Sequence, residues 1–392
     1  MHKSKMTRRL ALCAALTGTI GTAMINSAHA DPKQYTALIG VGSDTVQDVM
    51  NAYAGATNGT NYTPLQSSAA TGSRQLISFD AIPPAGVSGT CITPKLGGPT
   101  FTRPNGSSAG RRALSRAIDG TGYGEVTCGG PIDVSGQVNF ARSSAGPAAG
   151  DVGTALTYIP FGRDAVSFAT YRATGGAAVT TLTRAQLTSL FTTGPQVIAG
   201  VRIVPCGIQT SSGTYTFWNT VTTATATQEA TATAECNAFV ATGRAEENDG
   251  TALKARGDLA AAGDQVIIGF SAASFIAKSN GVAPGAPPAG VGIGSVSNNG
   301  SGVNLGSPVS GVAPNLNESA TFYGDATFGR NVYTVWSTPI VTGIGNNDVK
   351  SLVVGATSAL CAAGTTRDTF GFLASTSCGS TALQGSLIAG QL

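Results

Sequence analysis

Short apolar runs alternate along the chain with segments whose apolar residues recur at helical spacing. Residues 35–41 form an apolar run that ends just before a Gly, which is typical of a buried strand. A polar turn follows at 42–45, and Val46, Val49 and Met50 then recur at the spacing of a helix. Repeated along a chain, this order of strand, tight turn and helix predicts an α/β architecture.

The same alternation continues over most of the sequence. We expect strands over 138–141, 157–160, 164–171, 202–205, 265–270 and 330–336. We expect helices over 109–118 and 183–191, the second capped by Thr181 or Thr183, and a further helix that begins near Tyr215. Residues 281–317 are rich in Gly, Pro, Ser and Asn and have no period, so we predict a long surface insertion there.

Residues 1–30 have the pattern of a secretory signal peptide. Basic residues from Lys3 to Arg9 precede a mostly apolar stretch, and Ala28-His29-Ala30 matches a small-x-small site that predicts cleavage after Ala30. A membrane anchor is the weaker alternative, because the apolar run is short and is broken by Thr and Gly. Cys13 lacks the surroundings of a lipid-attachment site. We therefore predict a secreted or periplasmic protein with no stable membrane insertion.

Loss of this leader changes the charge and the chemistry of the chain. It removes four of the 23 basic residues and leaves 19 against 20 acidic ones, a balance that disfavours nucleic-acid binding. Both histidines, His2 and His29, leave as well, which excludes a Ser-His-Asp triad and imidazole ligation of a metal. Residues 106–110 match the G-x-S-x-G pattern of hydrolases, but without a histidine base we interpret the match as accidental. We predict no enzyme, no cofactor and no metal.

Six cysteines remain after the leader. An even number in an exported chain predicts three disulfides, and six cysteines allow 15 pairings. We expect the pairs to join neighbours along the chain, and the alternative of a zinc site lacks the close Cys-x-x-Cys spacing. The predicted pairs are Cys91–Cys128, Cys206–Cys236 and Cys361–Cys378.

Three turns rich in Ser, Thr and Gly stand at predicted helix N-termini, at 42–45, 105–108 and 210–214. A helix start offers unpaired N–H groups and partial positive charge, and hydroxyls add donors, so converging turns suit an oxyanion. Arg142 and Arg163 are candidate charged partners. The alternative is that each turn only caps its helix and that the arginines form ion pairs between domains.

The order of these turns resembles that of the periplasmic phosphate-binding proteins of ABC transporters, in the type II periplasmic-binding-protein superfamily. The motifs that carry the resemblance are Gly40–Thr45 after the first strand, Arg103–Gly110 at a helix start, Phe140–Ser144 after a Phe-centred strand, and Ser212–Thr214 at a later helix start. Together they span roughly Ala37 to Phe270. Each motif is short, and their order is the specific part.

The resemblance implies a two-lobed α/β fold with a ligand cleft between the lobes. Lobe 1 would comprise 36–155 and 268–392, including the insertion at 281–317, and lobe 2 would comprise 156–267. The ligand-binding residues that it implies are Ser43, Asp44, Thr45, Asn105, Gly106, Ser107, Ser108, Arg142, Ser143, Ser144, Ser212, Gly213 and Thr214. Closure of the lobes would replace water around the ligand with fixed donors.

Two charged residues of that family are missing from their usual places. Phosphate binders carry an Asp where this chain has Ser144, and an Arg shortly before the Ser-Gly-Thr turn, near Ile208 and Gln209 here. We expect Asp44 and Arg142 to replace these two charges from other loops.

These observations favour an exported solute-binding protein that captures an inorganic oxyanion, phosphate first, with an ABC transporter permease as its candidate partner. The alternative is a secreted surface or matrix protein on the same fold with a degenerate cleft, which the low charge and the insertion fit. A histidine-free hydrolase is a third hypothesis, and phosphoester turnover that is lost on Ser107→Ala would support it.

Overall fold

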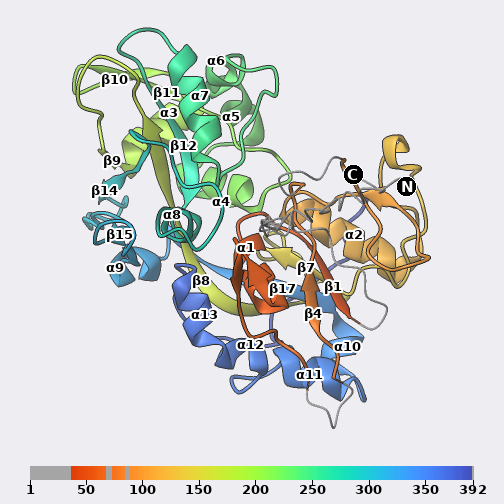
Figure 1. Cartoon of the computed structure of the whole chain (residues 1–392). Coiled ribbons are helices and arrows are strands. Elements are labelled where there is room, and N and C mark those ends of the chain that lie inside the picture. The colour runs from red at the N-terminus through yellow and green to blue at the C-terminus, as the bar shows by residue number, and fades with distance from the viewer. Residues whose placement is uncertain (1–36, 68–72, 84–88, 391–392) are drawn as a thin grey trace, which may run out of the picture.

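The computed structural model describes residues 37–67, 73–83 and 89–390. The predicted signal peptide, residues 1–30, lies outside this part of the chain. None of the described helices combines the length and the apolar character that a membrane span requires. The described chain is a mixed α/β structure built on one large sheet (Figure 1), which confirms the predicted fold class.

The large sheet has ten strands. Its main path runs β10-β11-β12-β8-β17-β7-β1-β4, and β13 and β18 pair with β8 beside that path. β4, β1 and β7 are parallel, whereas β8 runs antiparallel to β17 and β12. The strands are β1 Leu38–Gly42, β4 Leu76–Ser78, β7 Phe140–Ser143, β8 Leu156–Tyr171, β10 Gln196–Ile198, β11 Val201–Pro205, β12 Gln265–Ser271, β13 Gly292–Ile293, β17 Gly329–Ser337 and β18 Gln384–Gly385.

The remaining elements are short. The helices are α1 Gln47–Ala54, α2 Ser107–Asp119, α3 Arg184–Thr193, α4 Gly213–Thr222, α5 Ala226–Ala232, α6 Ala234–Asn237, α7 Gly250–Leu259, α8 Ala272–Ser279, α9 Ala320–Gly324, α10 Thr338–Thr342, α11 Asn347–Val353, α12 Ala359–Ala362 and α13 Gly364–Thr369, with a 3₁₀ turn at Val126–Cys128. The two-stranded pairs are β2 Ala56–Thr57 with β3 Thr60–Asn61, β5 Cys91–Ile92 with β6 Phe101–Thr102, β9 Thr181–Thr183 with β14 Ser295–Asn298, and β15 Val309–Ser310 with β16 Asn317–Glu318.

β8 belongs to two bodies at once. Residues 156–165 pair with β17, and residues 166–171 pair with β12. We call the body around β17, β7, β1 and β4 the first lobe, and the body around β12, β11 and β10 the second lobe; Figure 1 shows β8 running from one to the other. The predicted strands 157–160 and 164–171 are therefore one strand. A register shift opposite Phe161 lets it continue past Pro160 and Gly162.

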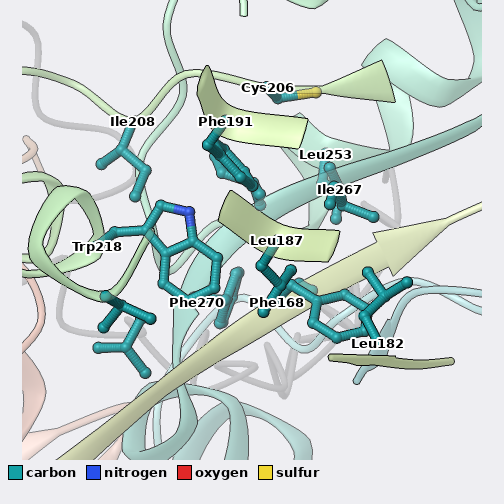
Figure 2. Close-up of a cluster of buried hydrophobic side chains, with 14 of the residues drawn as sticks. Phe168, Leu182, Leu187, Phe191, Cys206, Ile208, Trp218, Leu253, Ile267 and Phe270 are labelled. Carbon is teal, nitrogen blue, oxygen red and sulfur yellow. The ribbon is translucent and has the colours of Figure 1, made fainter. Parts of the chain in front are cut away.

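The second lobe packs around a cluster of aromatic and aliphatic side chains (Figure 2). Phe191 of α3 meets Trp218 of α4 edge to face, with ring centroids 5.4 Å apart. The predicted helix 183–191 is observed as α3. Its cap is Thr183, whose hydroxyl accepts from the Gln186 N–H, while the Gln186 side-chain oxygen accepts from the Thr183 N–H.

The first-lobe sheet separates two further clusters. On one face Met50 and Tyr53 of α1 join a cluster in which Phe140 and Trp336 stack at 4.9 Å. On the other face Leu114 of α2 packs with the rest of a second cluster. α1 and α2 therefore cover opposite faces, and α1 begins just after β1. α2 begins beside the same strand, where Gly42 bridges to Asn105.

Most of the segment 281–317 packs on the second lobe, whereas the predicted domain division assigns it to the first; its start, at Ala283, belongs to the first-lobe cluster of Met50 and Tyr53. β13 pairs with Ala169 and Thr170 of β8, and Val296 and Leu305 belong to the second-lobe cluster. The reason is that β8 offers β13 a second hydrogen-bonding edge in its later half. Short apolar stretches within the Gly-rich segment follow that edge into the core.

The three predicted disulfides are confirmed. Cys91–Cys128, Cys206–Cys236 and Cys361–Cys378 are all bonded, with Cα atoms 5.0–5.9 Å apart. The second of these holds the end of β11 to α6, directly before the turn that leads into α4.

Candidate functional site

The first turn of the candidate site, residues 43–45, follows β1. Gly42 has φ +116°, a conformation that favours glycine, and a Cβ there would lie 2.8 Å from the Arg142 carbonyl oxygen. The Ser43 N–H donates to that same carbonyl at 3.2 Å. Ser43, Asp44 and Thr45 are all buried. The end of β1 thus fixes a polar turn inside the molecule.

Three hydroxyls of the first lobe meet at this turn. Ser107 lies at the start of α2, and its Oγ accepts from the Ser144 N–H at 3.0 Å and lies 3.2 Å from Ser144 Oγ. Ser43 Oγ donates to Ser144 Oγ at 3.3 Å. The structure therefore brings together one residue from each of the three first-lobe motifs, far apart in the sequence.

The second lobe contributes the start of α4 to the same place. Ser212 caps α4, with its Oγ accepting from the Thr214 N–H at 2.9 Å. Thr214 Oγ1 lies 3.2 Å from Thr45 Oγ1 of the first lobe. A Cβ at Gly213 would lie only 2.5 Å from both Ser107 Oγ and Ser144 Oγ. The lobes are therefore closed on each other at this point.

The other predicted residues of these turns mostly form hydrogen bonds to the opposite lobe or within their own loop. Asn105 Nδ2 donates to Glu246 Oε1 at 2.9 Å, and the Ser108 N–H donates to the Ser211 carbonyl at 2.9 Å. Gly106 has φ +92°, and a Cβ there would lie 2.5 Å from the Ser211 carbonyl oxygen. The hydroxyl of Ser143 stays within its own loop and donates to the Ala145 carbonyl at 2.6 Å.

Arg142 has a supporting position rather than the expected ligand-facing one. Its fully buried guanidinium donates from Nε to the Ser43 carbonyl at 3.0 Å and from Nη2 to the Gly42 carbonyl at 2.9 Å. Nη1 donates to Ser78 Oγ and to the Phe79 carbonyl. Burial lowers the pKa of Arg142 to about 10. These four bonds hold the turn in place from behind. They use the donors of the guanidinium on protein oxygens.

Arg330 lies at the site and was not predicted to do so. It stands near the start of β17, is 5% exposed, and donates from Nη2 to Thr214 Oγ1 at 2.8 Å. Nη2 and Nε also donate to Asp164 Oδ2, at 2.8 and 3.1 Å. Its Nη1 is buried with no hydrogen-bond partner among the described residues. The only sequence signal was an Arg beginning an otherwise apolar strand.

The other predicted arginine, Arg163, lies away from these turns. Its guanidinium donates to the carbonyls of Tyr323 and Asp325, in and directly after α9. Neighbouring positions on a strand point to opposite faces, and this separates Arg163 from Asp164.

Two glutamates from one loop of the second lobe complete the site, and sequence reasoning missed both. Glu247 is fully buried, and its Oε1 accepts from Thr45 Oγ1 at 2.8 Å and from Ser212 Oγ at 2.6 Å. Burial raises the pKa of Asp44 well above its usual range, and the nearby Glu247 and Glu246 raise it further. Burial likewise raises the pKa of Glu246 to about 7. The carboxyl groups therefore crowd one another in a dry environment.

A pocket of about 500 Å³ opens beside these groups, between the two lobes. Its first-lobe wall includes Ile82, Arg103 and Asn105, and its second-lobe wall includes Arg244 and Glu246. Asn105 and Glu246 thus belong both to the pocket and to the buried site, which connects the site with the space between the lobes.

The sequence matches no family model and no curated protein. Among solved structures, a putative phosphate ABC transporter substrate-binding protein from Clostridium perfringens with bound phosphate is 12% identical, and the alignment covers 87% of this chain and 100% of that one, with a TM-score of 0.45. An ABC-type phosphate transport receptor from Vibrio cholerae is 11% identical over 86% and 100% of the two chains, with a TM-score of 0.41. PstS from Borrelia burgdorferi is 14% identical over 87% and 99%, with a TM-score of 0.37.

Proposed function

We propose that this chain is an exported solute-binding protein that captures an oxyanion, phosphate first, between its two lobes. The observation that carries the proposal is the meeting of donors from both lobes at one buried place. Ser43, Ser107 and Ser144 come from the first lobe and Thr214 from the second, with Arg330 beside them.

The chemistry of these groups suits an oxyanion. Hydroxyls are small donors that approach an anion from several sides, and the starts of α2 and α4 add partial positive charge. Arg330 pairs with Asp164, and its Nη1, which has no hydrogen-bond partner among the described residues, still has donors to offer an anion. In this structure the hydroxyls bond to one another, so an anion would bind by replacing those bonds with its own.

The fold also supplies a way to open and close. β8 pairs with strands of both lobes, so a bend in this strand would separate Gly213 from Ser107 and Ser144. Binding would be reversible, and closure would exchange water for fixed donors. The closed form would be the shape that an ABC transporter permease recognises.

The test is unfolding of the purified protein, stripped of ligand, with and without potassium phosphate and potassium sulfate. A ligand at about 100 times its dissociation constant adds about 2.7 kcal/mol to the free energy of unfolding. A rise in melting temperature with phosphate, followed by a saturable heat in calorimetric titration, is the expected result. A rise with sulfate alone would keep the mechanism and change the ligand.

A second function has one observation in its favour. Thr45 and Thr214 bond to each other across the lobes, and Ser107 and Ser144 bond to each other within the first lobe, so the hydroxyls of the site satisfy one another. This is what a secreted surface or matrix protein with a degenerate cleft would show. The absence of any shift with phosphate, sulfate or other oxyanions would favour that function over solute binding.

A further inference from the structure

We propose that Asp44, Glu246 and Glu247 bind a divalent cation with a preference for oxygen ligands, such as Ca²⁺ or Mg²⁺, where the lobes meet. Each residue offers a carboxylate oxygen, and these oxygens all lie within 4.8 Å of one another. Asp44 comes from the first lobe and the two glutamates from the second. The proposal goes beyond the oxyanion function and does not depend on it.

The unoccupied oxygens of this cluster are the second observation. Glu246 Oε1 accepts from Asn105, and Glu247 Oε1 accepts from Thr45 and Ser212. The remaining oxygens, both of Asp44 and Oε2 of each glutamate, are buried, and among the described residues no donor from outside the three carboxyl groups reaches them. Buried polar atoms without partners are rare in proteins and call for an explanation. Four of them at one place are what a bound cation would satisfy.

The spacing of the oxygens fits a shared ion. Ca²⁺ holds its oxygen ligands at about 2.3–2.6 Å, so two oxygens on opposite sides of one ion lie about 5 Å apart at most. The observed limit of 4.8 Å falls within that span. A ligand set made of carboxylates favours Ca²⁺, Mg²⁺ or Mn²⁺ over the metals that prefer nitrogen or sulfur.

The hydrogen bonds around the cluster resemble those that orient metal ligands. Oε1 of each glutamate accepts from donors of the opposite lobe or of the cap of α4, which leaves Oε2 available to coordinate. The pocket between the lobes is lined by Glu246 and offers the path by which a hydrated ion reaches the cluster.

A bound cation would change the electrostatic interactions within this cluster of carboxylates. Within the described chain, Arg330 pairs with Asp164, Arg244 pairs with Glu229, and Arg142 donates to carbonyl oxygens and Ser78. A divalent cation would turn the mutual repulsion of Asp44 with the glutamates into an attraction across the lobes. It would also relieve the repulsion that these carboxylates exert on an anion beside them.

The test uses protein stripped with EDTA in buffer without phosphate, and CaCl₂, MgCl₂ and MnCl₂ as the added salts. We expect one of them at millimolar concentration to raise the melting temperature and to give a saturable binding heat. Asp44→Asn and Glu247→Gln keep the shape of each side chain and should each weaken cation binding at least about tenfold. Glu125→Gln is the matched control, because Glu125 lines the same pocket but lies outside the cluster.

The stability of the variants separates ligation from a structural role. Removing one of several crowded buried carboxylates relieves repulsion, so Asp44→Asn without cation should melt no lower than the wild type and should no longer respond to it. A variant that fails to fold leaves the wild-type titration as the deciding measurement. If no salt changes the melting temperature or gives binding heat, or if both variants respond like the wild type, the cation site is rejected.

Phosphate is titrated separately into the same protein with EDTA present. A response to phosphate without a response to cations rejects the cation site and leaves the oxyanion proposal standing. A response to cations without one to phosphate does the reverse.

Discussion

Arg330 and Asp164 form an ion pair that is buried on both sides. Arg330 Nη2 and Nε lie 2.8 and 3.1 Å from the same oxygen, Asp164 Oδ2. The other oxygen of Asp164 accepts from Ser271 Oγ and from the Ala273 N–H, each at 3.1 Å. The pair joins β17 to β8 where β8 changes lobes, and Arg330 also reaches Thr214. A single guanidinium therefore links the hinge strand to the candidate site.

Arg330→Met should strongly weaken oxyanion binding and also destabilise the fold. It removes the charge that we propose for the anion, so we expect the phosphate affinity to fall at least about 100-fold, or about 2.7 kcal/mol. It also leaves Asp164 buried without its partner, which costs about 3–5 kcal/mol of unfolding free energy. Calorimetric titration and urea unfolding measure the two effects.

The double variant Arg330→Met with Asp164→Asn is the control for that experiment. It removes both charges, so it should recover much of the lost stability and none of the phosphate affinity. Binding close to that of the wild type in the double variant would show that Arg330 is a structural residue only.

Gly213→Ala should weaken ligand binding because it disfavours the closed arrangement of the lobes. In a helix an Ala normally stabilises relative to Gly by about 0.8–1.0 kcal/mol. At position 213, however, the new Cβ would lie 2.5 Å from Ser107 Oγ and Ser144 Oγ when the lobes are closed. We expect a stable protein whose lobes close less completely and whose phosphate affinity falls at least about tenfold.

Gly292→Ala is the matched control, since a Cβ at Gly292 meets nothing within 4 Å. Small-angle scattering with and without phosphate would report the closure. Equal affinity in Gly213→Ala and Gly292→Ala would contradict closure around α4 as the binding step.

Arg142→Met should affect stability far more than binding. The substitution leaves the carbonyls of Gly42, Ser43 and Phe79 without their donor, and each buried unpaired group costs about 1–3 kcal/mol. We expect the free energy of unfolding to fall by more than about 3 kcal/mol. Phosphate affinity, measured at a temperature where the variant is folded, should change only a few-fold. A loss as large as that of Arg330→Met would restore the expectation that Arg142 contacts the anion.

Local signals explain why much of the fold could be predicted. Thr183 and Ser212 cap helices through their own side chains, and the apolar run that ends at Gly42 forms β1. The four motifs were expected to converge, and the contacts of Ser43, Ser107 and Thr214 show that they do.

The charged residues of the site could not be assigned in the same way. Arg330 and Glu247 lie in segments without a motif, and only the pairing of β17 with β8 and the closure of the lobes bring them to Thr214 and Thr45. The resemblance required an arginine, and Arg142 followed a motif strand, so its sequence position favoured it. The orientation of its side chain is set by the backbone carbonyls that it bonds behind the turn. No sequence pattern indicates where those carbonyls lie.

The disulfide Cys206–Cys236 should be the more stabilising of the two in the later part of the chain. It closes a separation of 30 residues, against 17 for Cys361–Cys378, so the loss of loop-closure entropy predicts about 3.6 kcal/mol against about 3.1. Urea unfolding of the two double Cys→Ala variants measures both values. Because Cys206 holds the start of the turn before α4, its loss should also weaken phosphate binding. Unchanged binding after its removal would show that the turn is held by its hydrogen bonds alone.

Stability should fall as the pH rises from about 4 to 7, and Asp48 should account for part of that fall. Burial raises the pKa of Asp48, in the first turn of α1, from 3.8 to about 6. The folded state therefore keeps a proton that the unfolded state has already lost in this range, and its advantage is gone once the pH passes the folded pKa. Asp48→Asn should flatten the profile and raise stability near pH 7.5, although the side chain is only half-buried and solvent moderates the effect.

Asp133→Asn is the control of opposite sign, because hydrogen bonds from Ser135 lower the pKa of Asp133. Urea unfolding at pH 4, 5.5 and 7.5 decides the matter, and a profile for Asp48→Asn that coincides with the wild type would contradict the assignment.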